Sequence, residues 1–395
     1  MIKKRWLVVF FLAIAVRLGF AIRFPPTIPQ GDEIGYVGIA HNLLEGKGYS
    51  LGGESTTYRA PAYPIFLAIL YWCFGSSFGV VLVQAILGAC LCVIIYGFVK
   101  RLTDERSASL AALFVIFDPF LIYYTNKQLS EVMFAFLIVL SFWCFYKSFE
   151  PDRSFPWVIY AAIAWALTSL CRPSVFIFIF LAPVSYFLFF GIRKALLRSL
   201  VFVAVSFAVL SVWGFRNKKV AGHFVLTATN GGWTFWEGLN PRFDKEEDIL
   251  AWQSLMAEEL RGLQERGTSA IEVDRYYWNK SKSFVKDSPV AFMKLSVRKL
   301  IKFWRFYPYY PYSHSQRIVS ALYFVPLFLL AVVGMALSVS KKLCLPLLAF
   351  VFYFTAIHVL FWTQIRYRVP LHPILAVFAA LGARRFWPQK GVVGG

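Results

Sequence analysis

The chain has 395 residues, of which 58% are hydrophobic and 19% aromatic, whereas only 16% are charged. Its mean hydropathy of +0.60 is far above that of a soluble globular domain, so the composition excludes an ordinary soluble protein. Apolar runs of about 17 to 25 residues, the length that crosses a bilayer, recur along the whole chain. The sequence therefore predicts an all-α integral membrane protein.

The formal net charge is +20, and basic loops on the cytoplasmic side of a membrane protein account for most of such an excess. The positive charge is scattered over many loops and forms no concentrated stripe, so nucleic acid is not an expected partner. The six cysteines lie in or beside apolar runs and the five histidines are dispersed. Neither a disulfide framework nor a zinc site is therefore expected.

Trp6–Ile22 is the first apolar run, and it reads as an anchor because no small-residue cleavage site follows it. About ten spans are predicted, at residues 6–22, 77–99, 107–125, 130–147, 156–171, 173–190, 196–214, 317–338, 343–362 and 369–383. The apolar run 61–75 is short for a span and fits an interfacial helix better.

The distribution of Lys and Arg among the short loops predicts that both termini are cytoplasmic, in a multi-pass protein of the inner (plasma) membrane surrounded by membrane lipids. The chain reads as a single domain, 1–390, with two large outer segments at 23–76 and 215–316. The first should contain an amphipathic helix from Glu33 to Glu45. The second should contain a charged helix over about 243–266 and an aromatic, basic run over 276–312.

The polar motifs of these segments resemble those of the GT-C glycosyltransferases, in particular ArnT-like and protein-mannosyltransferase-like bacterial enzymes. The matching residues, in order along the chain, are Asp32-Glu33-x-x-Tyr36, Leu44-x-Gly46-x-Gly48-Tyr49, Thr57-x-Arg59-x-Pro61-x-Tyr63-Pro64, Leu129-Ser130-Glu131, Arg172-Pro173, Arg216-Asn217, Asn230-Gly231-Gly232 and Arg366-Tyr367-Arg368-x-Pro370. One departure is Ala62, where the pattern has a second proline.

This resemblance implies a GT-C bundle of about ten transmembrane helices with interfacial helices in the first outer loop. It implies transfer of a hexose or pentose from a polyprenyl-phosphate sugar to a glycan, lipid or protein acceptor. The transfer would take place on the periplasmic or extracellular face, with inversion, in the synthesis of a cell-envelope glycan or lipopolysaccharide.

Such a transfer needs a base for the acceptor proton, and the resemblance assigns that role to Asp32. Partial burial would raise the pKa of Asp32 toward neutrality, and the alternative is that Asp32 only caps the following helix. Glu33 can share the site or bind a divalent cation, or it can serve as a first-turn helix acid. Glu131 is the second candidate acid, or an N-terminal helix acid beside Lys127. Whether the site uses a metal stays open.

Two further charged residues lie inside or beside apolar runs. Asp118, which precedes Pro119, is expected to cap a helix that restarts at the proline, with catalysis as the alternative. Arg17, deep in the first span, is expected to snorkel outward or to pair with an acid such as Asp32.

Cations on the outer face suit the donor phosphate, because guanidinium groups match phosphate oxygens bidentately. The alternative for each cation is snorkelling to anionic lipid headgroups. The candidate substrate-binding residues are Tyr36, Arg59, Lys127, Arg172, Arg216, Arg366 and Arg368.

Two other functions remain open at this stage. One is a transporter or flippase of a lipid-linked or anionic solute, which should show internal repeats that the sequence lacks. The other is a polymerase or ligase of polyprenyl-diphosphate glycans, which would also use outer-face cations.

Overall fold

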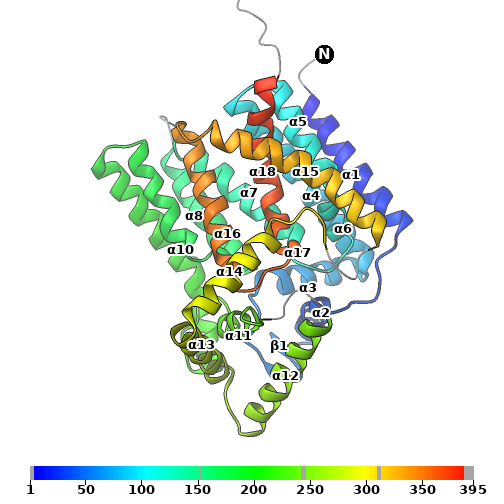
Figure 1. The fold of residues 1–395 in the computed structure, drawn as a ribbon, viewed down its shortest axis with the longest axis vertical. Coiled ribbons are helices and arrows are strands. Elements are labelled where there is room, and N and C mark those ends of the chain that lie inside the picture. Colours follow the sequence, from blue (N-terminus) through cyan, green and yellow to red (C-terminus); the bar gives the residue numbers. More distant parts are fainter. Residues whose placement is uncertain (1–3, 151–153, 242–245, 309–312, 387–395) are drawn as a thin grey trace, which may run out of the picture.

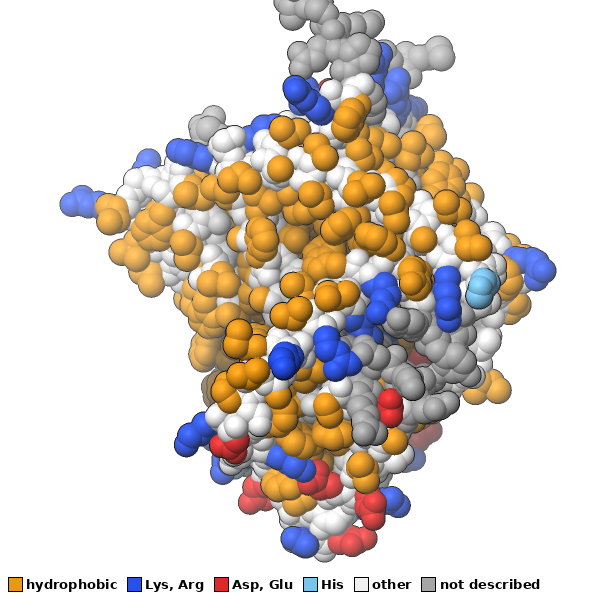
Figure 2. Space-filling view, in the orientation of Figure 1, with side chains coloured by type: hydrophobic (Ala, Val, Ile, Leu, Met, Phe, Trp, Pro, Cys, Tyr) orange, Lys and Arg blue, Asp and Glu red, His pale blue; other side chains and the backbone are white. Residues whose placement is uncertain are grey.

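The structure, a computed structural model, describes residues 4–150, 154–241, 246–308 and 313–386. Apolar helices form a bundle, and the helices of segments 23–76 and 215–316 gather at one end of it, to which we give the name outer end (Figure 1). The start of α1 (Arg5–Arg23) and the end of α18 (His372–Ala383) both lie at the opposite end (Figure 1). Figure 2 shows apolar side chains across the bundle and acidic side chains gathered on the outer end.

Each run that the sequence predicts as a span is helical in the structure. Besides α1 and α18, the bundle contains α4 (Ser77–Leu102), α5 (Glu105–Ile116), α6 (Pro119–Thr125), α7 (Glu131–Lys147), α8 (Phe155–Cys171), η1 (Pro173–Val175), α9 (Phe178–Leu181), η2 (Ala182–Leu188), α10 (Ile192–Ala221), α15 (His314–Ala336), η3 (Lys342–Cys344), α16 (Leu345–Leu360), η4 (Val369–Leu371) and η5 (Arg384–Phe386). The closest helix pairs are α15 with α18, α7 with α8, α1 with α4 and α8 with α10.

Five helices in the described part of the chain are long and apolar enough to cross a membrane, or six if the bent pair α5–α6 is one span. The others, such as α8, are shorter. The fold is thus that of an all-α membrane protein, whereas the count of about ten spans stays a prediction.

The predicted span 107–125 is not one straight helix, because its two halves, α5 and α6, meet at 51°. Asp118 lies at the break, and its Oδ1 accepts hydrogen bonds from the backbone N–H of Phe120 at 2.9 Å and of Leu121 at 3.1 Å. The carboxylate supplies partners for amides that Pro119 and the bend leave unpaired. The predicted capping role of Asp118 is confirmed.

Arg17 does not reach the membrane surface. Its side chain is only 1% exposed and lies against Gly88 of α4, where an added Cβ would approach Arg17 Nε to 2.4 Å. The guanidinium donates to the carbonyl oxygens of Ala13 and Val115, each at 3.2 Å. Both expectations for Arg17, snorkelling and pairing with Asp32, are therefore wrong, because its guanidinium bonds to backbone carbonyl oxygens inside the bundle.

The remaining elements lie at the outer end of the bundle (Figure 1). One group of these elements consists of α2 (Asp32–Leu44), β1 (Ser50–Leu51), β2 (Glu54–Ser55), α3 (Ala62–Phe74) and α17 (Ile365–Arg368). The second group, which we call the lobe, consists of α11 (Gly231–Glu237), α12 (Glu246–Glu265), α13 (Ala270–Asp287) and α14 (Pro289–Phe303). The predicted helix 33–45 is α2, and the predicted charged helix is α12, with 243–245 outside the described residues. The aromatic run 276–312 forms parts of α13 and α14, and 309–312 lie outside the described residues.

The ambiguous segment 61–75 forms α3, a helix of 13 residues that ends at Gly75 in a left-handed conformation. It packs on α2 and α4 at the outer end of the bundle (Figure 1). A helix of this length spans about 20 Å, which is less than the hydrocarbon thickness of about 30 Å. The geometry suits the interfacial position that the sequence favours.

The central helix α18 is buried along its whole length. Two glycines bring it against α15: a Cβ on Gly382 would lie 2.1 Å from the Leu330 carbonyl oxygen, and a Cβ on Gly334 would lie 1.8 Å from that of Phe378. Small residues at a membrane helix interface allow such close backbone approach.

We expect Gly382→Ala to lower stability by about 1–3 kcal/mol, because the added methyl group must push α15 and α18 apart. The measurement is the thermal unfolding midpoint of the purified protein in detergent. Gly19→Ala in α1 is the matched control, since a Cβ there meets nothing within 4 Å. Equal midpoints for the two variants would contradict the close packing.

Candidate active site

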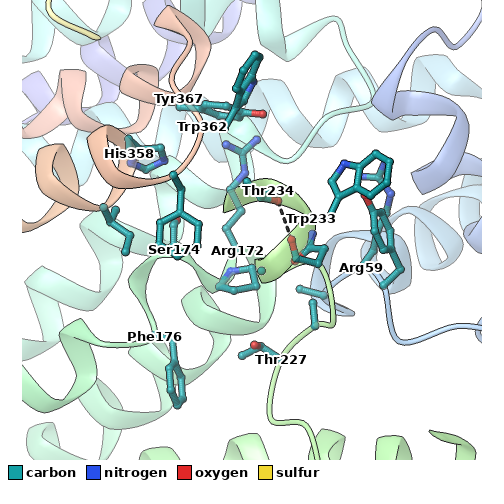
Figure 3. A pocket seen from close by; sticks show the side chains of 18 of the residues that line it. Arg59, Arg172, Ser174, Phe176, Thr227, Trp233, Thr234, His358, Trp362 and Tyr367 are labelled. Carbon is teal, nitrogen blue, oxygen red and sulfur yellow. Dashed lines mark hydrogen bonds between the residues drawn. The ribbon is translucent and has the colours of Figure 1, made fainter. Parts of the chain in front are cut away.

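A cavity of about 500 Å³ lies where the outer end of the bundle meets the lobe. Its wall combines the first outer segment, the ends of bundle helices, and α11 and α13 of the lobe. Figure 3 shows side chains from these parts, including Arg59, Arg172 and Trp233, around the space. Segments that are far apart in sequence therefore meet at one site.

Asp32 lies in this wall, held between two arginines. It is the first residue of α2, and Gly31 with φ of 56° occupies the N-cap position, so the alternative in which Asp32 caps the helix is wrong. Its Oδ1 accepts a hydrogen bond from Arg59 at 3.0 Å, and its Oδ2 accepts one from Arg366 at 2.8 Å. The side chain is 40% exposed, so a ligand in the cavity can reach it.

Glu131 lies behind Asp32, at the start of α7, and its side chain is fully buried. Its Oε1 lies 2.6 Å from Arg172 and also accepts a hydrogen bond from Arg366. The ion-pair partners of Glu131 are thus arginines and not Lys127. Because Arg366 contacts both carboxylates, it joins Asp32 to Glu131.

These five side chains form one continuous charge chain, in the order Arg59, Asp32, Arg366, Glu131 and Arg172. Three guanidinium groups and two carboxylates leave the charge chain with one net positive charge. Arg59 Nε and Glu131 Oε2 are buried and have no hydrogen-bond partner among the described residues. Such unpaired polar atoms are rare in native proteins. Arg59 lines the cavity, so its guanidinium can still donate to a ligand there, whereas Glu131 lies outside the cavity wall.

The charge chain also sets the ionisation of Asp32. Burial raises the pKa of this carboxyl, but the positive charges and hydrogen bonds of Arg366 and Arg59 outweigh burial and lower the pKa to about 2. The sequence-based expectation of a pKa raised toward neutrality is therefore wrong for the unliganded site, because burial brings two cations with it. Asp32 is a weak base as long as both arginines hold it.

Arg59 owes its position to a gap in α2. A Cβ on Gly35 would lie 2.8 Å from Arg59 Nε, so only glycine leaves room for the guanidinium against the helix. The guanidinium also lies over the ring of Tyr36, 4.4 Å from its centroid, in a cation–π contact. Tyr36 thus contributes to the site by supporting Arg59.

Arg216, a predicted phosphate ligand, supports the same loop from α10. Its guanidinium donates to the backbone carbonyl oxygens of Thr56 at 2.6 Å and of Tyr49 at 2.8 Å. The same loop is also held by a hydrogen bond between the hydroxyl groups of Thr57 and Thr229, which are 2.9 Å apart. Arg216 is not part of the cavity wall and instead holds the loop that carries Arg59.

Glu33 also turns away from the cavity. Its two carboxylate oxygens accept backbone hydrogen bonds from Gln128 at 2.7 Å and from Gln30 at 3.2 Å, and only 4% of the residue is exposed. Within the described residues, no group of three His, Cys, Asp or Glu side chains could hold a metal. Since guanidinium groups also occupy Asp32 and Glu131, the residues present do not fit a divalent cation.

The two remaining candidates lie outside the cavity wall. Lys127 donates from its Nζ to the Thr27 hydroxyl at 2.8 Å on the surface. Arg368 is fully buried and donates to the carbonyl oxygens of Phe303 at 2.6 Å and Arg305 at 2.8 Å. Arg368 therefore fastens the end of α14 to the segment that carries Arg366.

Several residues of the wall escaped the sequence analysis. α11 and α13 contribute Trp233, Glu237, Asp274 and Trp278. The Asn230-Gly231-Gly232 motif preceding Trp233 was noticed, but no spacing rule connects it to a helix that follows some forty residues later. Tryptophan residues near a membrane usually mark the membrane–water interface. The sequence therefore favours an interfacial position for Trp233 and Trp278 and gives no sign that they line a cavity.

The overall architecture is similar to that of solved membrane glycosyltransferases. An oligosaccharyltransferase of Archaeoglobus fulgidus, tethered with an acceptor peptide, matches with a TM-score of 0.59 and 16% identity, covering 97% of this chain and 50% of that one. A structure of the same organism's AglB with an inhibitory peptide and a dolichol-phosphate matches with a TM-score of 0.58 and 17% identity, with the same coverage. The chain thus spans about half the length of the archaeal enzyme.

ArnT of Cupriavidus metallidurans, bound to undecaprenyl phosphate, gives a TM-score of 0.46 at 12% identity, covering 97% of this chain and 78% of that one. The fold assignment rests on the closer archaeal structures. The chain has the GT-C fold, as its motifs predicted.

At the sequence level, residues 58–214 match the family described as dolichyl-phosphate-mannose-protein mannosyltransferase. This segment includes Arg59, Glu131 and Arg172 of the charge chain. No curated protein matches the chain.

We expect Glu131→Gln to destabilise the protein by about 3–5 kcal/mol, because it leaves Arg172 and part of Arg366 buried without their counter-charge. The measurement is the shift of the thermal unfolding midpoint in detergent. Glu150→Gln is the matched control, since Glu150 pairs with Arg101 on the surface, where such pairs contribute about 0–1 kcal/mol. A shift no larger than that of the control would show that the charge chain is not a structural unit.

Proposed function

We propose that the chain is a glycosyltransferase that transfers a sugar from a polyprenyl-phosphate-linked donor to a glycan, lipid or protein acceptor. The observation that carries this proposal is the charge chain at the cavity, in a GT-C fold, with one exposed carboxylate and three guanidinium groups. Guanidinium groups bind phosphate oxygens bidentately, and a nearby carboxylate can take a proton. These are the two requirements of glycosyl transfer from a phosphate.

The charge of the charge chain favours a donor with one phosphate. A polyprenyl-monophosphate sugar is a phosphodiester with a single negative charge, which neutralises the net charge of +1 on the charge chain. A diphosphate donor would leave the charge chain with excess negative charge. This comparison supports a monophosphate donor over the polyprenyl-diphosphate glycans of a polymerase or ligase.

In the proposed reaction an acceptor oxygen attacks the anomeric carbon while the bond from that carbon to the phosphate oxygen breaks. The electron pair of the breaking bond goes to the phosphate, and the acceptor proton goes to Asp32. A single displacement of this kind inverts the configuration. Arg59, Arg172 and Arg366 would stabilise the charge that develops on the leaving phosphate.

The donor would also activate the base. When the donor phosphate accepts hydrogen bonds from Arg59 and Arg366, Asp32 loses part of their stabilisation and gains a negative neighbour. Both changes raise the pKa of Asp32 above its unliganded value of about 2. Asp32 would therefore become an effective base only in the loaded site.

The prenyl chain would lie along the apolar side of the cavity. Phe176 and Ile177, beside η1, and Tyr353 and Ile357 of α16 line this side. Ile177 is 50% exposed, so the wall continues from the cavity to the outer surface of the bundle. An apolar wall of this kind suits a hydrocarbon tail whose phosphate is held by the charge chain.

The proposal includes a membrane orientation. We place the chain in the inner (plasma) membrane as one domain, with segments 23–76 and 215–316 on the periplasmic or extracellular face and both termini in the cytoplasm. Arg5, Lys100, Arg101 and Arg384 support this orientation, because they lie at helix ends opposite the lobe, where the positive-inside rule places basic residues.

Replacing Asp32 by Asn tests the proposal directly. The assay follows transfer of label from a radiolabelled polyprenyl-monophosphate sugar by the purified protein in lipid. We expect Asp32→Asn to lower kcat by about 10²- to 10⁴-fold, because the amide cannot accept the proton. Asp104→Asn is the matched control: Asp104 caps α5, outside the cavity wall. Undiminished transfer by Asp32→Asn would exclude it as the base, and no turnover by the wild type would contradict the function itself.

The pH dependence of the transfer rate tests whether the donor activates Asp32 as a base. The base is the ionised form of Asp32, so activity is lost as the pH falls through its pKa. kcat/KM for the donor, at saturating acceptor, reports the unliganded pKa of about 2, whereas kcat reports the loaded site. We expect the acid limb of kcat at a higher pH than that of kcat/KM. If kcat and kcat/KM fell at the same acidic pH, the donor would not raise the pKa of Asp32, and the proposed activation would be contradicted.

A further inference from the structure

α11 presents one of its faces to the cavity. Trp233, Thr234 and Glu237 follow the spacing i, i+1, i+4, which puts them on the same side of a helix, and all three line the cavity. Figure 3 shows Trp233 and Thr234 on this helix beside the space that Arg59 and Arg172 also border. The charge chain does not include any of these three residues.

Close backbone contacts hold α11 in place. A Cβ on Gly232 would lie 2.1 Å from the Asp274 carbonyl oxygen of α13, and a Cβ on Gly238 would lie 2.1 Å from that of Phe361. The carboxylate of Asp274 also accepts a hydrogen bond from the Gly232 N–H at 2.7 Å. These contacts at both ends of the short helix fix the direction in which Trp233 and Glu237 point.

Glu237 is a positioned carboxylate with spare capacity. Its Oε1 accepts a hydrogen bond from Gln253 of α12 at 2.7 Å, the only hydrogen-bond partner of this carboxylate among the described residues. Burial raises the pKa of Glu237, and the negative charge of Asp32 adds to the effect. Because Glu237 lines the same cavity, its carboxylate can accept further hydrogen bonds from a ligand there.

The two sides of the cavity thus differ in chemistry. Arg172 and Arg366 reach it from the bundle side, whereas α11 and α13 contribute two indoles and two carboxylates from the lobe. Indole faces pack against the C–H face of a sugar ring, and carboxylates accept hydrogen bonds from its hydroxyls. The lobe side is therefore suited to a carbohydrate.

We propose that the lobe side of the cavity is the acceptor subsite, and that the acceptor is a carbohydrate whose ring packs on Trp233 and whose hydroxyl donates to Glu237. This inference rests on the proposed function, because it takes the phosphate to lie on the arginines. Direct displacement requires the acceptor to approach the anomeric carbon from the side opposite the leaving phosphate. A phosphate on the bundle side leaves the lobe side, with α11, for the acceptor.

A binding experiment tests this subsite without donor or turnover. The probes are methyl α-mannoside, methyl α-glucoside and methyl β-galactoside, with saturation-transfer NMR on the purified full chain in nanodiscs. We expect at least one glycoside to bind. Trp233→Ala and Glu237→Gln should each weaken its binding about tenfold, because the first removes the aromatic face and the second removes the charge of the hydrogen-bond acceptor. Trp233→Phe should retain part of the affinity, because it keeps an aromatic face.

The controls show whether a variant loses glycoside binding because a contact in the subsite is removed or because the lobe is misfolded. Glu259→Gln is the matched carboxylate variant, since Glu259 pairs with Lys280 in the same lobe but does not line the cavity. It should bind the glycoside as the wild type does. Each variant must also keep the wild-type unfolding midpoint, and a hexapeptide containing Ser and Thr should not displace the glycoside.

Three results would overturn the inference: no glycoside binds, binding is unchanged in both Trp233→Ala and Glu237→Gln, or the hexapeptide competes with the glycoside. The outcome is independent of the transfer assay. Glycoside binding without turnover of a polyprenyl-phosphate donor would contradict the proposed function, whereas turnover with a peptide acceptor alone would contradict only the carbohydrate subsite.

Discussion

The pairing of two carboxylates with three guanidinium groups is the interaction on which the rest of this site depends. A carboxylate as buried as Glu131 is costly near hydrocarbon unless cations accompany it, and Arg172 and Arg366 supply them. Arg366 then reaches Asp32, whose second oxygen is held by Arg59. Five separate motifs of the sequence are thereby joined by charge beside one cavity.

Much of the surrounding structure can be understood as support for this pairing. Gly35 leaves the space that Arg59 fills, and Arg216 holds the loop before it through backbone carbonyl oxygens. Glu33 accepts a hydrogen bond from the backbone N–H of Gln128, close to the start of α7, and so connects the beginning of α2 to the segment that leads to Glu131. The lobe completes the enclosure with α11 and α13, which cover the side of the cavity away from the bundle.

The sequence predicted the helices well because an apolar run in a membrane must satisfy its backbone internally, and the Asp118-Pro119 break was predictable from local capping chemistry. Charged residues were harder. Arg17 and Arg216 both bond to carbonyl oxygens of segments distant in sequence, and no local pattern reveals such partners. Asp32 was identified through the motif it belongs to, whereas Glu237 has no motif and gains its place only through packing of α11 on α13.

The net charge of the charge chain bears on how a catalytic cycle would end. In the proposed transfer the lipid phosphate gains one negative charge, and Asp32 becomes neutral by taking the acceptor proton. The arginines would therefore attract the lipid product more strongly than they attracted the donor. Polyprenyl phosphate would then be a product inhibitor, and its release would be the rate-limiting step of turnover. The partial exposure of Asp32 gives its proton a path to the outer solvent. After losing that proton, Asp32 would again compete with the lipid phosphate for Arg59 and Arg366. This competition would promote release of the polyprenyl phosphate.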